Sequence, residues 1–148
     1  MKILLAGTYP DLTTEKLSAM LGDGFDIVTA ETQQEYEAVT DADIMIIRVL
    51  KAYRDSIERI KGLKMIMRWG TGFDSVDIAA AGENGIYVTN TPGANSGAVS
   101  ELVLMMMLAL ERKLYLHKEA LSKGIWSKND YMNESFCIKG KTVGTIVS

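Results

Sequence analysis

Cysteine and histidine occur once each in this sequence, and proline occurs only twice. The lone Cys137 cannot form an internal disulfide, so no disulfide framework is expected. The N-terminal segment MKILLAGTYPD reaches glycine, proline and aspartate before the apolar region of a signal peptide could develop. We therefore expect a cytoplasmic protein. The one histidine, His117, lies in the charged segment YLHKEAL, where we interpret it as a surface residue and not as a general acid.

Long apolar runs and basic clusters are also missing. The longest apolar stretch, Leu102 to Leu110, is about half as long as a membrane-spanning helix, which favours a buried helix. The net charge is −3, and no run of lysine and arginine offers a binding face for nucleic acid or anionic lipid. Neither nucleic acid nor a membrane is expected as a partner, and the sequence predicts no metal site.

Five short apolar segments alternate with segments of helical character. The expected strands are residues 2–7, 25–30, 43–48, 63–69 and 85–90, which are continuously apolar, as buried parallel strands are. The expected helices between them are residues 13–21, 32–39, 52–60 and 75–83, and Thr32 with Glu35 fits a capping box for the second helix. This alternation predicts an α/β domain with a doubly wound, five-stranded parallel sheet over residues 1–94.

Residues 95–123 predict one long helix of roughly 40 Å. Its first half is apolar on nearly all faces and includes Met105, Met106 and Met107, which we interpret as packing residues. Another domain, another subunit or both must cover this half. Residues 124–148 predict a polar loop and then a parallel strand at Thr142 to Val147. That strand either joins the first sheet or begins a second domain.

The segment RWGTGFDSVD, residues 68–77, directly follows the fourth expected strand. Ligands of open α/β sheets bind beyond the carboxyl ends of the strands. Gly70 and Gly72 allow a ligand to approach the main chain, so that N–H groups can converge on an anion. The Thr71 hydroxyl can donate or accept a hydrogen bond. Taken alone, however, Gly-Thr-Gly is weak evidence, because most glycine pairs are only turns.

The longer run RWGTGFDSVDIAAAGENGIYVTNTPGANSGAVSELVLMMMLALERKL closely resembles the D-isomer-specific 2-hydroxyacid dehydrogenases. The matching features are Arg-x-Gly-x-Gly, Val-Asp, Gly-Ile-x-Val-x-Asn-Thr-Pro and an Ala-x-x-Glu helix start. Gly-Thr-Gly, with Asn95 and Ser96 before the helix, is similar to the phosphoglycerate dehydrogenase branch. The resemblance covers essentially the whole chain. It implies a flavodoxin-like substrate domain, an interdomain and dimerisation helix, and the first strand of an incomplete Rossmann domain.

The resemblance also implies roles for particular residues. Gly70 and Gly72 would offer backbone amides to the carboxylate of a 2-keto or 2-hydroxy acid, and Thr71 would lie on the cofactor side, near the nicotinamide. Arg48 matches a position that faces the cleft and would attract an anionic substrate, although a solvated surface arginine is an equally good interpretation. Leu50 stands where the phosphoglycerate branch often has a basic or polar side chain, which disfavours a phosphorylated substrate.

The parts that complete such an enzyme are not expected within these 148 residues. In the family that the chain resembles, the catalytic arginine, acidic residue and histidine come later in the chain, so no catalytic residue is assigned, and Glu101 would orient or cap the long helix. NAD is the implied cofactor, but no Gly-x-Gly-x-x-Gly follows GKTVGTIVS to bind its pyrophosphate. We therefore expect the truncated N-terminal part of an NAD-dependent oxidoreductase, inactive alone, that dimerises through the helix from Ser96.

Other interpretations compete with this one. A non-enzymatic remnant or assembly module would dimerise, or would complement a separate NAD-binding half. A receiver domain needs an acidic cluster after the first strand and an aspartate at the end of the third, where this chain has AGTYPD and Arg48. A flavodoxin needs a phosphate loop after the first strand, and Pro10 removes an amide donor from that loop.

Overall fold

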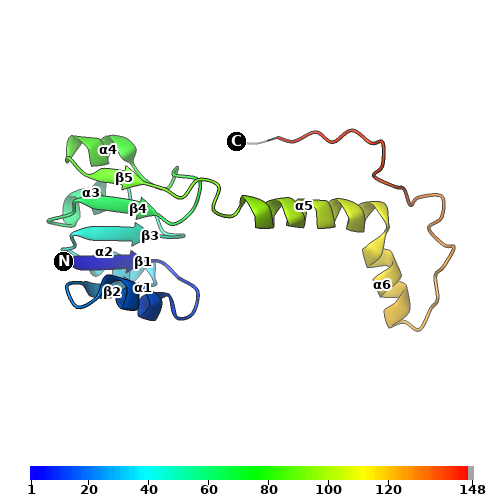
Figure 1. Ribbon diagram of the computed structural model, residues 1–148, viewed down its shortest axis with the longest axis horizontal. Coiled ribbons are helices and arrows are strands. Elements are labelled where there is room, and N and C mark those ends of the chain that lie inside the picture. The colour runs from blue at the N-terminus through cyan, green and yellow to red at the C-terminus, as the bar shows by residue number, and fades with distance from the viewer. Residues whose placement is uncertain (147–148) are drawn as a thin grey trace. The chain divides into compact units, whose positions relative to one another are not determined.

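The computed structural model describes residues 1–146. The chain divides into two compact units, Met1–Ala94 and a second unit that begins at Asn95. Figure 1 labels the helices and strands of both.

The first unit is built on a five-stranded, all-parallel sheet in the order β2-β1-β3-β4-β5 (Figure 1). The strands are β1 Lys2–Ala6, β2 Asp26–Ala30, β3 Ile44–Ile47, β4 Met65–Arg68 and β5 Tyr87–Thr89. The five expected strands and their parallel arrangement are confirmed, with ends that lie within two residues of the predicted ones.

Four helices connect these strands, as the sequence predicts. They are α1 Thr13–Leu21, α2 Gln33–Ala38, α3 Arg54–Arg59 and α4 Ile78–Glu83. The capping box at α2 is confirmed, because the Glu35 N–H donates to Thr32 Oγ1 at 3.2 Å and the Thr32 N–H donates to Glu35 Oε2 at 3.1 Å.

The core lies on both faces of the sheet. Neighbouring residues of one strand point to opposite faces, so Leu4 belongs to one buried cluster and Leu5 to the other. The larger cluster includes residues of α2, α3 and α4, whereas side chains of α1 pack on the smaller one. Helices therefore cover both faces, which confirms the doubly wound arrangement.

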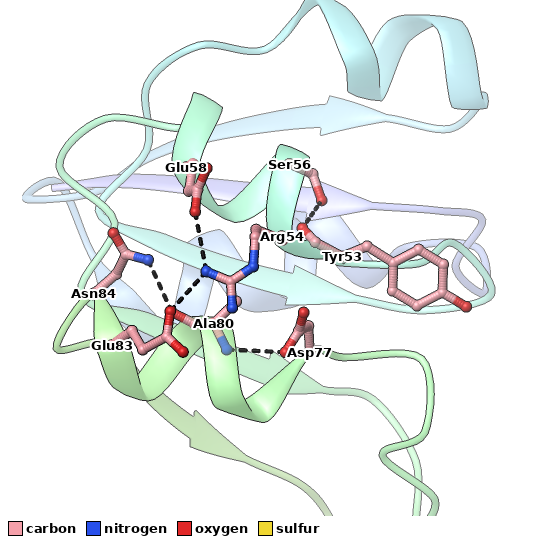
Figure 2. A network of polar contacts seen from close by, with 8 residues as sticks. All are labelled: Tyr53, Arg54, Ser56, Glu58, Asp77, Ala80, Glu83 and Asn84. Atoms are coloured by element: carbon pink, nitrogen blue, oxygen red, sulfur yellow. Dashed lines mark hydrogen bonds and ion pairs between the residues drawn. The ribbon is translucent and has the colours of Figure 1, made fainter.

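A network of polar contacts joins α3 to α4 on the outside of the first unit (Figure 2). Arg54 Nη1 lies 2.7 Å from Glu83 Oε2 and 3.2 Å from Glu58 Oε1. Asp77 caps α4 by accepting the Ala80 N–H at 2.9 Å. These contacts fix the two helices at their exposed side, opposite the face that packs on the sheet.

We expect the melting temperature to fall as the pH is lowered through 4.5. The hydrogen bond from Arg54 and the Arg54 charge lower the pKa of Glu83 below its ordinary 4.5, and backbone N–H groups, first that of Thr32, likewise lower the pKa of Glu35. Carboxylates with a lowered folded-state pKa stabilise the fold above their unfolded-state value, and this contribution is lost as the pH falls through the folded-state value. Thermal melts between pH 6 and pH 3 measure the effect.

Glu83→Gln provides the control for this prediction. The variant keeps a hydrogen-bonding group but has no charge to titrate, so it should melt at a lower temperature than the wild type at pH 6. Its melting temperature should then fall less between pH 6 and pH 3. If the melting temperatures of the two proteins fell equally with pH, Glu83 would contribute nothing to the acid sensitivity of the fold.

The second unit contains two helices where the sequence predicts one. They are α5 Ser96–Glu111 and α6 Leu114–Ser122. The prediction of a continuous helix over 95–123 is wrong, because Lys113 adopts a left-handed conformation with φ 53° that ends the helical hydrogen-bond pattern. The ribbon turns at this point in Figure 1.

His117 on α6 also differs from its prediction as a surface residue. It is half-buried, its Nδ1 lies 2.9 Å from the buried Ser127 hydroxyl, and its ring meets Tyr131 edge-on at 5.1 Å. The side chain therefore holds the following loop against the helix.

The predicted strand near the C-terminus is not formed in the described part of the chain. Residues 142–146 have no regular structure, and Val143 and Ile146 are exposed; Val147 lies outside the described residues. A strand is stabilised by ladder hydrogen bonds to a neighbour, and within residues 1–146 no strand edge pairs with this segment. The sheet therefore gains no sixth strand from the described residues.

Candidate functional site

The candidate site lies at the carboxyl edge of the sheet, where the strand ends of β1, β3 and β4 meet. Ala6 is paired with Ile47, and Ile47 with Arg68, so the residues that follow these positions come together at one edge. The Trp69 N–H donates to the Ile47 carbonyl at 2.9 Å and continues this pairing by one residue. Three loops of distant sequence thus form one surface.

Arg48 is held firmly at this edge. Its backbone N–H donates to the Ala6 carbonyl at 2.8 Å, and its Nη1 donates to the Thr8 carbonyl at 2.5 Å. Gly7 has φ 111°, and a Cβ atom on it would lie 1.7 Å from the Arg48 carbonyl oxygen. Any side chain at position 7 would therefore clash with the backbone of Arg48. Arg48 is half-buried, and its hydrogen bond to Thr8 lies at the exposed surface.

The turn after Arg48 is strained. The Leu50 N–H donates to the Arg48 carbonyl at 2.8 Å across Val49, whose φ is 70°. A β-branched residue with positive φ is rare, and a three-residue turn of this hand is an uncommon, strained form. Strained backbone persists only where its surroundings fix it, and it concentrates at functional sites.

Arg68 lies across the glycine loop. Its Nε donates to Ser75 Oγ at 3.2 Å, and its Nη1 donates to the Trp69 carbonyl. Gly70 has φ 147°, and a Cβ atom there would lie 2.7 Å from Arg68 Nη1. The lack of a side chain at Gly70 is thus what lets the guanidinium lie close to the loop.

The loop that carries Thr71 is held by its neighbours. The Gly70 N–H donates to the Arg68 carbonyl at 2.9 Å, and the Gly70 carbonyl accepts the Thr91 N–H at 3.1 Å. Asn90 Nδ2 donates to the Thr71 carbonyl at 2.7 Å. Within residues 1–146, no hydrogen bond engages the Gly72 N–H. One of the two glycine amides is therefore used inside the loop, and the other is open to a ligand.

Tyr9 connects the loop after β1 to the ends of β3 and β4. Its hydroxyl donates to the Ile46 carbonyl at 2.6 Å, and its ring meets Trp69 edge-on at 5.4 Å. Burial raises the pKa of Tyr9 well above its ordinary value, although the nearby charges of Arg48 and Arg68 oppose the rise. Tyr9 therefore stays neutral and acts as a packed hydrogen-bond donor.

A hollow of about 380 Å³ opens beside the loop. Its lining residues are Lys51, Tyr53, Arg68, Gly72, Asp74 and Ser75. Within the described part of the chain, neither Lys51 nor Arg68 forms an ion pair with a carboxylate, and the same holds for Arg48. In this lining the two cations Lys51 and Arg68 outnumber the one carboxylate, Asp74. An excess of positive charge beside an open backbone amide is suited to an anion.

The structure brings the four predicted site residues to one edge, with Gly70, Thr71 and Gly72 on one loop and Arg48 on the next. Their predicted roles in binding remain predictions. Three contributors were missed by sequence reasoning: Arg68, Tyr9 and Asn90. Arg68 had a signal, since it ends an apolar strand directly before the glycines. Tyr9 and Asn90 had none, because their contacts join distant segments.

The described residues do not fit the pyrophosphate of a dinucleotide. That group needs a strand, a glycine-rich turn and a helix whose first N–H groups point at the phosphates. Residues 142–146, where the sequence predicts the strand of such a unit, are irregular and exposed. Within residues 1–146, no residues are therefore assigned to a pyrophosphate.

The five-stranded order and the two-sided helical cover together define an open α/β domain. Domains of this class bind ligands beyond the carboxyl ends of their strands. Residues 4–143 match the family model described as D-isomer specific 2-hydroxyacid dehydrogenase, catalytic domain. The chain belongs to the D-isomer-specific 2-hydroxyacid dehydrogenase family, which confirms the resemblance found in the sequence.

Individual relatives agree with this assignment. The chain is 37% identical over 123 residues to a D-3-phosphoglycerate dehydrogenase from Methanocaldococcus jannaschii, covering 82% of this chain and 23% of the relative. It is 36% identical over 117 residues to a hydroxypyruvate reductase from Thermotoga maritima, covering 78% of this chain and 38% of that protein. These curated relatives are thus far longer than this chain.

A solved structure gives the same result for the fold. The NAD⁺-bound 3-phosphoglycerate dehydrogenase of Entamoeba histolytica is 32% identical and superimposes with a TM-score of 0.68, covering 76% of this chain and 40% of that one. The flavodoxin-like, five-stranded parallel architecture is therefore shared with an enzyme of the family.

Within residues 1–146, none of the helices has the length and apolar content that a bilayer span requires. The described residues also place no three His, Cys, Asp or Glu side chains where they could hold a metal ion together.

Proposed function

We propose that residues 1–94 form the substrate-binding part of an NAD-dependent oxidoreductase that interconverts a D-2-hydroxy acid and a 2-keto acid. One observation carries this proposal: an open glycine amide and the arginines Arg48 and Arg68, without carboxylate partners in the described part of the chain, meet at the carboxyl edge of the sheet. The family membership of the chain supports the same reaction class.

The substrate carboxylate binds in this proposal at the glycine loop. The Gly72 N–H is the first donor, and the Gly70 N–H becomes the second when it leaves its short-range bond to the Arg68 carbonyl. Hydrogen bonds from charged groups are the stronger ones, so the Arg68 guanidinium beside the loop adds most of the attraction. Arg48 contributes from the neighbouring loop, and Thr71 lies on the cofactor side.

NAD and the groups that transfer protons belong, in this proposal, to a dinucleotide-binding part other than residues 1–146. The described residues supply recognition of the acid, and the isolated chain of 148 residues is therefore inactive. The names of the relatives leave the acid open, since a phosphoglycerate dehydrogenase and a hydroxypyruvate reductase are both among them.

An assembly function is the second candidate, because the apolar face of α5 is exposed. Leu102, Leu104, Met105 and Met106 are each at least half exposed, and Leu110 is exposed by 66%. Monomeric proteins rarely leave so much contiguous apolar surface open to water. We propose that a second copy of the chain covers α5 in a homodimer. Each copy then carries its own candidate site on residues 1–94.

Titration of the ¹⁵N-labelled chain with glyoxylate tests the substrate site. We expect amide shifts centred on residues 70–72 and Ser75, and we expect Arg68→Gln to weaken binding by about tenfold, since a hydrogen bond to a charged group is lost. Lys16→Gln, which removes one positive charge from the exposed surface of α1, should bind like the wild type.

Two results would contradict the proposal. Equal weakening by Lys16→Gln and Arg68→Gln would mean that glyoxylate responds to net charge and not to a site. Oxidation of NADH by the purified 148-residue chain in the presence of glyoxylate would show that the chain needs no separate dinucleotide-binding part.

A further inference from the structure

A second hollow of the first unit lies where α2 and α3 meet, outside the glycine loop. It has a volume of about 350 Å³, and its lining includes Tyr36 and Glu37 of α2 and Asp55, Ser56 and Arg59 of α3. Two hydroxyls, two carboxylates and a guanidinium therefore converge on a space large enough for a small molecule.

The Tyr36 hydroxyl is a buried polar group without a partner. Tyr36 is 1% exposed, and within residues 1–146 its hydroxyl forms no hydrogen bond. The Ser56 hydroxyl donates instead to the Tyr53 carbonyl at 2.8 Å (Figure 2). Burial raises the pKa of Tyr36, and the nearby Ser56 side chain and the Arg59 charge oppose the rise. The hydroxyl is therefore protonated, lies on the side of α3, and is suited to a ligand that accepts a hydrogen bond.

Arg59 offers a second donor beside this hydroxyl. Its Nε donates to the Val39 carbonyl and its Nη2 to the Tyr36 carbonyl, both at 3.1 Å. These bonds fix the guanidinium, whose central carbon lies 5.4 Å from the centre of the Tyr36 ring. Within the described part of the chain, Nη1 of Arg59 forms no hydrogen bond and Arg59 forms no ion pair. A fixed guanidinium beside an unpaired hydroxyl is suited to a carboxylate.

The charges that line this hollow are equal in number. Its cations are Lys51 and Arg59, and its carboxylates are Glu37 and Asp55. Among the described residues, no two of these four form an ion pair. Glu37 accepts a hydrogen bond from Gln33 Nε2 at 2.7 Å, which leaves the Asp55 carboxylate as the one better placed to receive a cation. Opposite charges that do not neutralise each other are complementary to a ligand that carries both.

We infer that the hollow between α2 and α3 is a second binding site, which takes a small zwitterion with one carboxylate and one ammonium group. The Tyr36 hydroxyl and Arg59 bind its carboxylate, and Asp55 binds its ammonium group. The site is separate from the proposed substrate site but adjoins it, because Lys51 and Tyr53 line both hollows. The hollow beside the glycine loop has an excess of positive charge, whereas the charges of this one balance.

Titration of the ¹⁵N-labelled chain with glycine tests the inference. Acetate carries only the carboxylate of glycine, and methylammonium carries only its ammonium group. We expect amide shifts centred on residues 33–37 and 55–59, with glycine binding there at least about tenfold more tightly than either analogue, because each analogue lacks one charged hydrogen-bonding group. Glycine shifts confined to residues 70–72, or equal affinity for glycine and acetate at α2 and α3, would overturn the inference.

Two variants and two matched controls assign the contacts. Tyr36→Phe and Asp55→Asn should each weaken glycine binding by about tenfold, since each removes a hydrogen bond that involves a charged group. Tyr87→Phe and Asp26→Asn make the same chemical changes at exposed positions outside the hollow and should bind glycine like the wild type. Equal weakening by the variants and their controls would contradict a site at this hollow.

Thermal melts test the unpaired hydroxyl independently of any ligand. Tyr36→Phe loses no hydrogen bond of the fold, so it should melt at the wild-type temperature or above it. A lower melting temperature would show that the hydroxyl is already bonded within the fold, which would remove the basis of the inference. Because glyoxylate binding is read at residues 70–72, failure of the glycine site would leave the substrate proposal intact.

Discussion

Replacing Gly7 by alanine is expected to lower the free energy of unfolding of the first unit by about 3 kcal/mol or more. The new Cβ would lie 1.7 Å from the Arg48 carbonyl oxygen and 2.8 Å from the carbonyl carbon. Both atoms belong to the backbone at the end of the central strand β3, so no side-chain rotation relieves the clash. The residue would also keep a φ of 111°, which alanine rarely adopts.

Gly22→Ala separates the clash from the cost of the backbone conformation. Gly22 has φ 75°, but no atom outside its immediate neighbours lies within 4 Å of a Cβ placed there. This variant should lose only about 1 kcal/mol, the cost of a left-handed alanine. Urea unfolding followed by circular dichroism measures both variants. Equal losses would mean that the backbone of β3 moves away from position 7 at little cost.

The second large effect is expected for Met45→Ala, which should destabilise the first unit by about 3 kcal/mol. Met45 lies in the middle of β3, its side chain is fully buried, and it belongs to the larger core cluster. Truncation removes buried apolar surface and leaves a cavity that a close-packed sheet cannot fill. The same urea titration detects the change as a lower midpoint with an unchanged slope.

Met20→Ala makes the same chemical change at a site that is 84% exposed, on α1. It should shift the free energy of unfolding by less than about 0.5 kcal/mol. If Met20→Ala lowered the free energy of unfolding nearly as much as Met45→Ala, the assignment of the core to the sheet faces would be contradicted. Such a result would mean that the loss does not depend on whether the methionine is buried.

The sheet could be predicted from the sequence because its determinants are local. Each strand is a short, continuously apolar run, and the Thr32–Glu35 capping box marks the start of α2 within four residues. The break between α5 and α6 could not be predicted in this way. Arg112 and Lys113 are good helix formers, and neither glycine nor proline marks the point where Lys113 turns left-handed.

The candidate site was predictable only in part for a related reason. Gly70 and Gly72 stand out in the sequence because glycine permits a backbone that other residues avoid. Tyr9 does not stand out, because its hydrogen bond reaches Ile46, 37 residues later, and exists only once β1 and β3 are paired. The register of β3 against β4 places Arg68 beside Ile47. Sequence patterns identify the loop, whereas the charges around it depend on strand pairing.

Every strand after β1 pairs with a strand that a ribosome would already have delivered. The strands β2 and β3 pair with the two edges of β1, and all three are complete once residue 47 has been made. The strands β4 and β5 then join the same growing edge in turn. Each new strand therefore finds its hydrogen-bonding neighbour already synthesised, and no strand edge has to wait for a segment encoded far downstream.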